Sequence, residues 1–542
     1  MSARERYNQL STSRTQFLNK AVECSELTLP YLIQDDNATR INHRSFQTPW
    51  QSVGAKAVVT LAAKLMLALL PPQTTFFKLQ VRDDKLGEAG LDPQIRSELD
   101  LSFSKMERMV MDYIAASSDR VVVHQALKHL IVGGNSLIFM GKNGLKNFPL
   151  NRYVVNRDGN GNILEIVTKE LISRRVLGED LLNTIEPEPN RVSDSKGSDD
   201  DDVEVYTCVK SDEKSGRWVW YQEVFDKIIP ASRSTAPKNA SPWLPLRFNT
   251  VDGEDYGRGR VEEFIGDLKS LEGLSQALVE GSAAAAKVVF LVSPSSTTKP
   301  KTIAEAGNGA IVQGRPEDVA VIQVGKTADF TTAANLAQQI EKRLGDAFLV
   351  LSVRQSERTT AEEVRLTQME LEQQLGGLFS LLTVEFLIPY LNRTLLVLTR
   401  TNQLPKLPKE MVRPTIVAGI NALGRGQDRE SLTAFVTTIA QTLGPEALMQ
   451  YINADEAIKR LAAAQGIDVV NLVKTQQQIA QEHQQAQQQQ VAGSLVDQAG
   501  QIAGTPMMDP EKNPDGFNNM SEMIGDQLGA SAEANQQPPM EE

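Results

Sequence analysis

The spacing of apolar residues predicts a long helix near the start of the chain. Over residues 50–70, apolar side chains recur at close to the 3.6-residue period of an amphipathic helix. Pro71 and the proline after it end the pattern, because proline cannot continue a helix. Thr48 and Gln51, with a proline between them, predict a capping box at the N-terminus of this helix. Residues 100–140 are predicted to be helical as well.

The next part of the chain has the alternation that is typical of β-strands. Residues 153–155 and 163–168 flank a Gly- and Asn-rich stretch at 157–162, which predicts a β-hairpin. Residues 203–221 alternate again and are predicted to form strands. The first 250 residues therefore predict a mixed α+β region.

Two long helices with a β-like segment between them are predicted next. An apolar helical stripe begins at Val261 and ends in small residues at 281–286, which let helices approach closely. Residues 287–324 carry short β-like runs that glycine and proline interrupt. A second helix is predicted over residues 331–350, where apolar residues lie four apart. The two helices are expected to bracket a compact tip.

A polar, arginine-bearing stretch follows the second helix. It reads VRQSERTTAEEVR and contains Arg354 and Arg358. Thr360 and Glu363 form a second capping box, which predicts a firm helix start after the loop. This helix is expected to continue as far as Pro389. A loop held rigidly at both ends is suited to contacting another molecule.

The C-terminal part of the chain is polar and repetitive. Residues 409–475 predict short helical pieces, and ten of the fifteen residues from 476 to 490 are glutamine. From Asp497 to the end, nine acidic residues accompany a single basic residue, Lys512. Such a composition predicts a disordered acidic tail.

Composition limits the compartment and the partners. The 542 residues carry a formal net charge of −12, and 41% are hydrophobic and 23% charged. This globular composition suits three or four domains of about 150 residues each. The acidic balance argues against broad, non-specific attraction to nucleic acid or anionic membranes. Two cysteines in so long a chain favour a reducing compartment, and neither a signal peptide nor a transmembrane helix is expected.

Catalytic and metal-binding motifs are incomplete in this sequence. The Gly-Lys-Thr at 325–327 has Ala320 where a phosphate-binding loop needs glycine. Asp158 begins a calcium-loop-like pattern that lacks the later glycine and glutamate, so a hairpin turn explains it better. His124 and His129 are five residues apart and do not share a helix face as a zinc pair would. No catalytic residue, metal site or cofactor is predicted, and the chain is not expected to be an enzyme.

Several short segments, in their joint order and spacing, resemble one protein family over residues 5–475. These segments are Phe46–Gly54 (FQTPWQSVG), Ala63–Leu69, Gly314–Asp318, Ala328–Phe330, Thr360–Glu363, Leu375–Gly377, Leu407–Glu410 and Gly424–Asp428. The chain resembles the head-to-tail connector, or portal protein, of short-tailed podophages of the Autographiviridae type. The C-terminal 60 residues are similar only in character.

The resemblance implies a mainly α fold with an α+β wing. This phage portal fold, with wing, stem, clip and crown, is assembled as a ring around a central channel. The implied regions are an α+β wing at 1–257, a stem helix at 258–286, a clip at 287–330, a second stem helix at 331–350, a channel loop and return wing helix at 351–415, a helical crown at 416–490 and a disordered acidic tail at 491–542.

The resemblance also implies a function and a set of partners. A ring of twelve copies, a dodecamer, at one capsid vertex is expected to conduct DNA, first inward during packaging by the terminase motor and later outward during ejection. The implied partners are the terminase large subunit, the major capsid and scaffolding proteins, the tail adaptor (tail tube) protein, internal core proteins and double-stranded DNA, with no membrane. The implied location is the virion, and the host cytoplasm during assembly.

In this scheme Arg354 and Arg358 are the candidate DNA-channel residues. Phosphate contacts come mostly from arginine and lysine, and both arginines lie in the expected channel loop. Alternatively, both arginines pair with acidic residues of the neighbouring subunit and stiffen the ring. A competing function is that of a minor capsid or scaffold protein without a channel.

Overall fold

Two compact units divide the chain, Met1–Gly424 and Arg425–Glu542. The computed structural model describes residues 1–35, 47–71, 75–81, 93–177, 202–212, 214–285, 289–295, 299–307, 309–311, 313, 315–322, 327–350, 376–405, 412–416 and 435–442. In the second unit, residues 435–442 are helical, which agrees with the prediction of short helical pieces there. The fold described below is that of the first unit.

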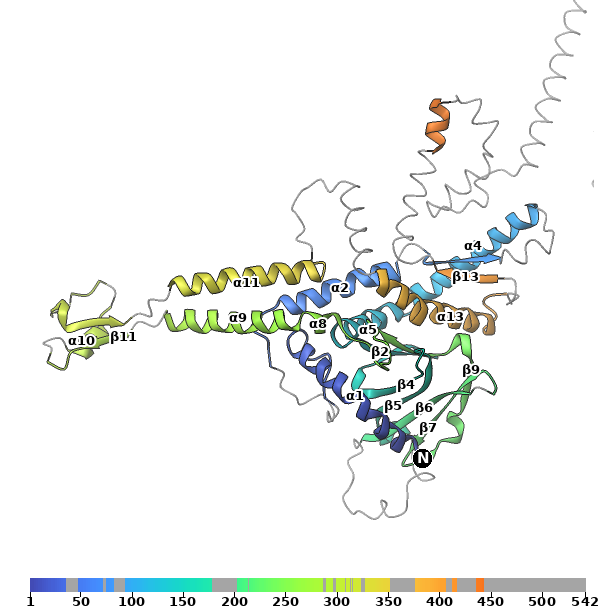
Figure 1. Ribbon diagram of the computed structural model, residues 1–542, viewed down its shortest axis with the longest axis horizontal. Coiled ribbons are helices and arrows are strands. Elements are labelled where there is room, and N and C mark those ends of the chain that lie inside the picture. The colour runs from blue at the N-terminus through green and yellow to red at the C-terminus, as the bar shows by residue number, and fades with distance from the viewer. Residues whose placement is uncertain are drawn as a thin grey trace, which may run out of the picture. The chain divides into compact units, whose positions relative to one another are not determined.

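The first unit contains both helices and sheets, which agrees with the predicted mixture of the two. The helices are α1 (Ala3–Glu26), α2 (Val53–Leu69), α4 (Pro93–Ala116), α5 (Asp119–Gly133), α6 (Arg174–Leu177), α8 (Arg260–Glu263), α9 (Ile265–Ala285), α10 (Pro300–Glu305), α11 (Thr327–Ala347) and α13 (Ile388–Arg400). Figure 1 shows α1 lying along the largest sheet, where it packs against β4, β5 and β6.

Every strand pairing in the described part of the chain is antiparallel. The largest sheet has six strands in the order β4-β5-β6-β7-β8, with β9 paired to β7. These strands are β4 (Tyr153–Arg157), β5 (Ile163–Ser173), β6 (Asp202–Asp212), β7 (Arg217–Val224), β8 (Lys227–Ile228) and β9 (Ser234–Pro237). A second sheet has the order β10-β2-β3, formed by β10 (Trp243–Arg247), β2 (Asn135–Gly141) and β3 (Gly144–Phe148). Two-stranded sheets pair β1 (Phe77–Val81) with β13 (Val412–Ile416), and β11 (Val289–Val292) with β12 (Val319–Ile322).

The α2 helix lies in the main core and confirms the predicted amphipathic helix. Its buried side follows the helical period through Ala57, Leu61 and Leu65. The predicted capping box at its start is wrong, because α2 begins at Val53 without a side-chain cap. The polar groups of Gln51 are used elsewhere: its amide nitrogen donates to the oxygen of Leu27, and its amide oxygen accepts from the nitrogen of Gly54.

The helix predicted over residues 100–140 is correct only in its first part. After α5 the chain turns at Gly134, whose φ of 73° favours glycine, and continues as the strand β2. A Cβ at Gly134 would also lie 2.5 Å from the oxygen of Gly257. The prediction of helix is therefore wrong for the apolar run after Gly134, because a short apolar run fits a buried strand as well as a helix.

The predicted hairpin around residue 160 is confirmed. Strands β4 and β5 pair, and the turn between them is closed by Asp158. Its carboxylate accepts hydrogen bonds from the main-chain nitrogens of Asn160 and Asn162, and one from the Asn162 side chain. These bonds lower the pKa of Asp158, with the Asn162 side chain contributing most. The acidic and amide groups therefore serve a turn, as predicted, and among the described residues no group of three or more metal-ligating side chains is found.

The helix after the polar stretch passes through Pro389 instead of ending there. From Gly376 to Arg400 the chain is helical, with a π-helical turn at Thr383–Leu387. In this turn the nitrogen of Ile388 donates to the oxygen of Thr383, five residues back. The wider turn makes room directly before Pro389, which has no N–H and would clash with the preceding turn of an α-helix.

This same helix is long and apolar enough to span a membrane by length and composition alone. A core helix of a soluble protein passes the same test, and here Phe386, Leu387 and Tyr390 are buried in the main core.

Residues 412–416 form a strand, so the prediction of helix for this part of 409–475 is wrong. The strand β13 pairs with β1, and Pro414 lies opposite Leu79. Its partner is more than 300 residues earlier in the sequence, and a local pattern does not contain such a pairing.

Candidate functional site: the helical arm and its anchors

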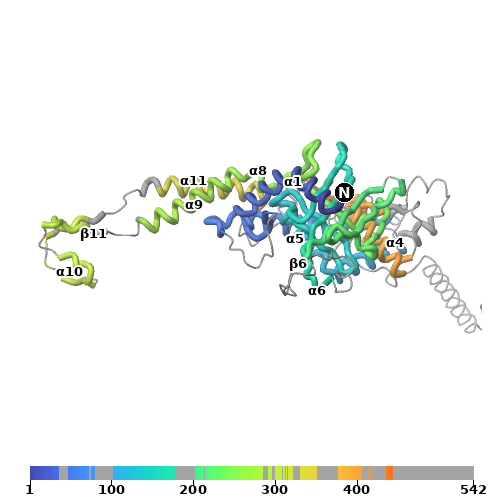
Figure 2. The backbone as a smooth tube through the Cα atoms, turned by 90° about the horizontal axis from the view of Figure 1, so that it is seen from below, coloured from blue at the N-terminus to red at the C-terminus, as the bar shows by residue number. Residues whose placement is uncertain are grey.

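A pair of antiparallel helices forms the arm of the molecule, which we define as α9 and α11. Figures 1 and 2 show the two helices side by side and running away from the sheets. Both contain 21 residues and are therefore about 32 Å long. Arg343 of α11 donates to Asp267 of α9 at 2.8 Å, and the ring of Phe330 lies against Gly281. The small residue predicted to permit close helix packing does so at Gly281.

The distal half of the arm has no core of its own. None of the side chains at 272–284 and 330–339 is buried, whereas Leu271, Ile340 and Leu344 nearer the sheets are. Val279 and Leu336 on this half are 53% and 47% exposed. Apolar positions on a helix normally face a core. The distal half therefore presents apolar surface that this copy of the chain leaves uncovered.

The base of the arm is tied to the N-terminal elements. The carboxylate of Glu272 accepts from the main-chain nitrogens of Trp50 and Gln51, at 2.8 and 3.4 Å. Lys269 forms an ion pair with Glu23 of α1. The bonds to Glu272 also explain why the predicted capping box does not form, because a distant carboxylate takes the N–H groups that a local cap would satisfy.

The C-terminal end of α11 is closed by a turn with an unusual residue. The nitrogen of Val350 donates to the oxygen of Gly345 at 2.7 Å, which is the 6→1 bond of a Schellman motif. Leu349 takes the left-handed position of this motif, with φ of 55°. A left-handed conformation costs about 1–2 kcal/mol for a residue with a side chain. Leu349 is only 4% exposed, and burying a leucine gains about 1.5–3 kcal/mol, so burial offsets the strain.

Two basic side chains from other elements meet this end of α11. Arg260 of α8 donates to the oxygen of Ala347 at 3.2 Å, and Nζ of Lys64 from α2 donates to the oxygen of Leu349. The last turn of α11 has no basic residue of its own. Positive charge is favourable at a helix C-terminus, where the peptide dipoles leave a partial negative charge. Residues 351–375, which lie outside the described residues, follow directly.

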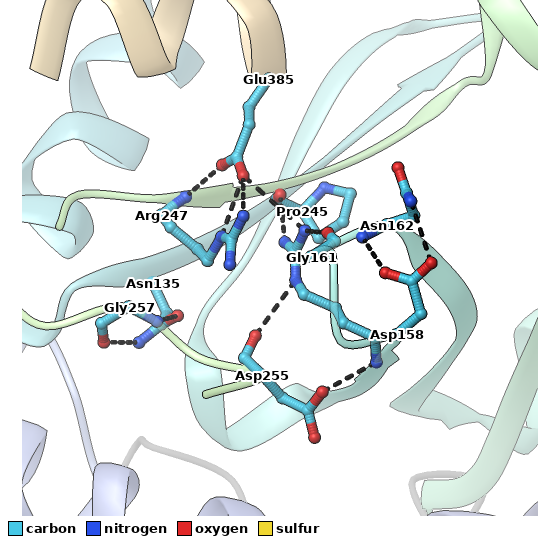
Figure 3. A network of polar contacts seen from close by, with 10 residues as sticks. Asn135, Asp158, Gly161, Asn162, Pro245, Arg247, Asp255, Gly257 and Glu385 are labelled. Carbon is cyan, nitrogen blue, oxygen red and sulfur yellow. Dashed lines mark hydrogen bonds and ion pairs between the residues drawn. The ribbon is translucent and has the colours of Figure 1, made fainter. Parts of the chain in front are cut away.

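After this segment, the chain is anchored again through Glu385 (Figure 3). Its carboxylate, in the π-helical turn, accepts from the main-chain nitrogen of Arg247 at 2.9 Å and from two guanidinium nitrogens of Arg247 at 2.9 and 2.7 Å. A second guanidinium, that of Arg157, lies 3.7 Å from the same carboxylate. All three side chains are at most 11% exposed.

Arg157 holds the neighbouring loops in place. Its guanidinium donates to the main-chain oxygens of Gly161, Pro245 and Asp255, at 3.0, 3.0 and 3.1 Å. Burial lowers the pKa of Arg157, and the charge of Glu385 opposes that effect. Because arginine stays charged throughout the accessible pH range, Glu385 compensates a permanent buried charge.

A further contact ties α13 to α5. The hydroxyl of Tyr390 donates to the carboxylate of Asp119 at 2.7 Å, and both side chains are buried. Burial and the nearby Asp119 charge raise the pKa of Tyr390 well above its usual value. The chain is therefore held on both sides of residues 351–375, by Lys64 and Arg260 before them and by Glu385 and Tyr390 after them.

The candidate residues Arg354 and Arg358 lie outside the described residues, so their role remains a prediction. The described anchors were not predicted from the sequence. The sequence pattern places Lys64 in an amphipathic helix and gives it no further role. Glu385 and Arg247 are 138 residues apart, so no local pattern contains their contact. A glutamate four residues before a proline, within an apolar helix, is the one local signal of Glu385.

Comparison with known families identifies the class of protein. The family described as bacteriophage head to tail connecting protein matches residues 1–472. The chain belongs to this family. The predicted resemblance to head-to-tail connectors of Autographiviridae podophages, and the prediction of a portal protein of a tailed phage, are confirmed.

Named relatives extend over nearly the whole chain. The portal protein of Escherichia phage T7 is 37% identical over 537 residues, which cover 97% of this chain and 98% of the relative. The portal protein of Enterobacteria phage T3 is 40% identical over 485 residues, covering 88% and 89%. That of Enterobacteria phage SP6 is 30% identical over 502 residues, covering 90% and 92%. Neither the family nor these relatives indicates a catalytic activity.

Among solved structures, the chain is similar to the neck of an empty gene transfer agent particle. That chain is 12% identical with a TM-score of 0.38, over 77% of this chain and 90% of that one. A chain from the virion of a native gene transfer agent particle is 10% identical with a TM-score of 0.35, over the same two shares.

Proposed function

We propose that this connector assembles as a ring of twelve copies around a channel at one capsid vertex, and that double-stranded DNA passes through the channel during packaging and ejection. In this proposal residues 1–257 form the wing, 258–286 and 331–350 the stem, 287–330 the clip, 351–415 the channel loop and return helix, and 416–490 the crown, with 491–542 as an acidic tail.

The uncovered distal half of the arm is the observation that supports a ring. The two helices have no fully buried side chain at 272–284 or 330–339, so this half gains little stability alone, because helices in water depend on tertiary packing. In a ring, the arm of a neighbouring copy supplies an apolar surface that covers Val279 and Leu336. The exposed Leu291 of the β11–β12 sheet fits a tip that partner proteins grip.

The charge of the chain supports passage of DNA without strong binding. A net charge of −12 repels the phosphate backbone, so a few basic residues at the narrowest point limit the contact. Arg354 and Arg358 are the proposed phosphate-facing residues, and the two anchors around 351–375 suit a loop that keeps its position while DNA moves past. The alternative role of these arginines is ion pairing between subunits.

The proposed partners follow from this position in the particle. They are the terminase large subunit during packaging, the tail adaptor afterwards, and the capsid, scaffolding and internal core proteins around the vertex. The proposed location is the virion, at the junction of head and tail, after assembly in the host cytoplasm.

Electron micrographs of the purified protein test the ring. Twelve-fold rings with a central hole are expected. Monomers or filaments would instead favour the alternative, a minor capsid or scaffold protein without a channel.

A second experiment replaces Arg354 and Arg358 by alanine, with the exposed Lys342→Ala on α11 as the control. Loss of DNA from filled heads in the double variant alone is expected, and unchanged packaging and retention would remove the two arginines from the channel.

A further inference from the structure

Two arginine side chains lie two turns apart on one face of α13. Arg393 and Arg400 are seven residues apart, which corresponds to about 10.5 Å along the helix axis. Arg393 is partly buried and Arg400 is exposed. Burial lowers the pKa of Arg393, and the positive charge of Arg400 lowers it further. The two guanidinium groups are therefore close enough to repel each other.

Arg393 has no anionic partner among the described residues. Its Nε atom is buried without a hydrogen-bond partner. The only described charge that acts on it is that of Arg400, which has the same sign. A buried charge without a partner is unfavourable, and buried polar atoms in native proteins are normally hydrogen-bonded. The surroundings of Arg393 therefore suit an anion that the described part of this chain does not supply.

Other buried arginines in the described part of the fold are compensated within the chain. Arg157 and Arg247 share the carboxylate of Glu385. Arg14 donates to a tyrosine hydroxyl and to two main-chain oxygens. Arg393 differs from all three, because neither a carboxylate nor a hydrogen-bond acceptor of the described residues compensates it.

We propose that Arg393 and Arg400 form a binding site for a phosphate group. A guanidinium donates two parallel hydrogen bonds to two oxygens of a phosphate, and its planar shape matches that geometry. A negative charge bound by both arginines also offsets the repulsion between them. Free phosphate and the phosphates of a nucleic acid backbone share this chemistry. The site consists of described residues of a single copy and depends neither on a ring nor on Arg354 and Arg358, so it goes beyond the proposed function.

Thermal unfolding of the full chain tests the site. The melting temperature is measured in phosphate and in chloride at the same pH and ionic strength, since a ligand that binds only the folded chain raises it. Arg393→Met and Arg400→Met each remove one guanidinium. Arg233→Met, which removes an exposed arginine outside α13, is the matched control. A short DNA duplex, added in chloride, separates backbone phosphates from the free ion.

We expect phosphate to raise the melting temperature of the wild type and of Arg233→Met, and this shift to be lost in Arg393→Met and Arg400→Met. A shift with the duplex alone, lost in the same two variants, would assign the site to backbone phosphates. In chloride, Arg393→Met is expected to be at least as stable as the wild type, because it removes an uncompensated charge. If Arg393→Met does not fold, Arg393→Lys keeps the charge without the planar group and is expected to reduce the shift.

Three results would overturn the proposal. An equal shift in all four proteins would be a general effect of the salt. The absence of a shift with either probe would show that no phosphate binds. Loss of rings in micrographs of Arg393→Met, where the wild type forms them, would mean that Arg393 pairs with an acidic group of a neighbouring copy. Ring formation by the wild type is recorded separately, so a failure of the proposed function does not obscure the result for phosphate.

Discussion

The size of one side chain determines how closely the two helices of the arm approach. A Cβ at Gly281 would lie 2.4 Å from a ring carbon of Phe330, closer than real atoms come. Gly273, on the same helix, has no atom within 4 Å of the position of its Cβ. The missing side chain of Gly281 therefore leaves space for the ring of Phe330, whereas Gly273 makes no such contact and only lowers the helix propensity.

Replacing these two glycines by alanine is expected to stabilise the arm at 273 but not at 281. Gly273→Ala gains helix propensity of about 1 kcal/mol and should raise the melting temperature. Gly281→Ala has the same gain but displaces the Phe330 ring, which costs about 1–3 kcal/mol. Thermal unfolding of the two variants in parallel measures the difference. Equal stability would show that the ring adapts without cost.

His129 is the residue from which a pH dependence of stability is expected. It is 2% exposed, and burial lowers its pKa from 6.5 to about 4. The unfolded chain binds a proton below pH 6.5, whereas the folded chain does so only near pH 4. The protonation of His129 therefore does not affect the free energy of unfolding above pH 6.5. As the pH falls towards 4, this one residue lowers the free energy of unfolding by about 3 kcal/mol in total.

His129→Leu is expected to flatten the stability profile between pH 6.5 and 4. Urea denaturation at several pH values measures this effect. His124→Leu is the control on the same helix, where the histidine is less buried. A profile for His129→Leu with the wild-type slope would assign the acid sensitivity to other groups.

At the scale of elements, the sequence pattern correctly predicted those features that interactions between nearby residues determine. The hairpin around Asp158 and the apolar face of α2 were predicted, because turn chemistry and helical period are encoded within a few residues. The start of α2 and the strand β13 were not predicted, because each depends on a contact with a residue or strand that is distant in sequence, Glu272 for α2 and β1 for β13. The anchors of residues 351–375 belong to this second class.

The π-helical turn and the ion pairs of Glu385 link α13 to the strands. Glu385 is the carboxylate partner of both Arg247 and Arg157, so its loss leaves buried positive charge without compensation. Regular helix rules gave no reason to expect this role, since they predicted that the helix would end at Pro389.

Glu385→Gln is expected to destabilise the first unit by about 3 kcal/mol, the range for breaking a buried ion pair. Glu263→Gln is the matched control, because the Arg260–Glu263 pair is more exposed, and it is expected to cost less than about 1 kcal/mol. Urea denaturation compares the two. Similar losses would mean that the network around Glu385 is no stronger than a surface pair.

At the scale of the whole molecule, the net charge of the chain bears on the proposed function. If the copies assemble into a ring as proposed, chains that each carry a net charge of −12 repel the phosphate backbone and hold DNA loosely. The family membership was predicted from segments spread over residues 5–475 and is confirmed, whereas the ring stays a proposal because it depends on contacts between copies of the chain.

The isolated ring is expected to bind double-stranded DNA weakly. At about 150 mM salt, the dissociation constant should be no tighter than about 1 µM, as for non-specific contacts. Filter binding over a range of salt concentrations measures it. A nanomolar complex at physiological salt would contradict the account of the channel as a passive conduit.

The uncovered distal half of the arm has a thermodynamic consequence for a chain that assembles as proposed. Its helices reach their full burial only when neighbours are present, so folding of the arm and association of the copies form a single equilibrium. Stability then increases with protein concentration. An open arc still exposes one arm surface at each end, and the last copy covers both at once. Complete circles are therefore favoured over fragments without any added closing factor.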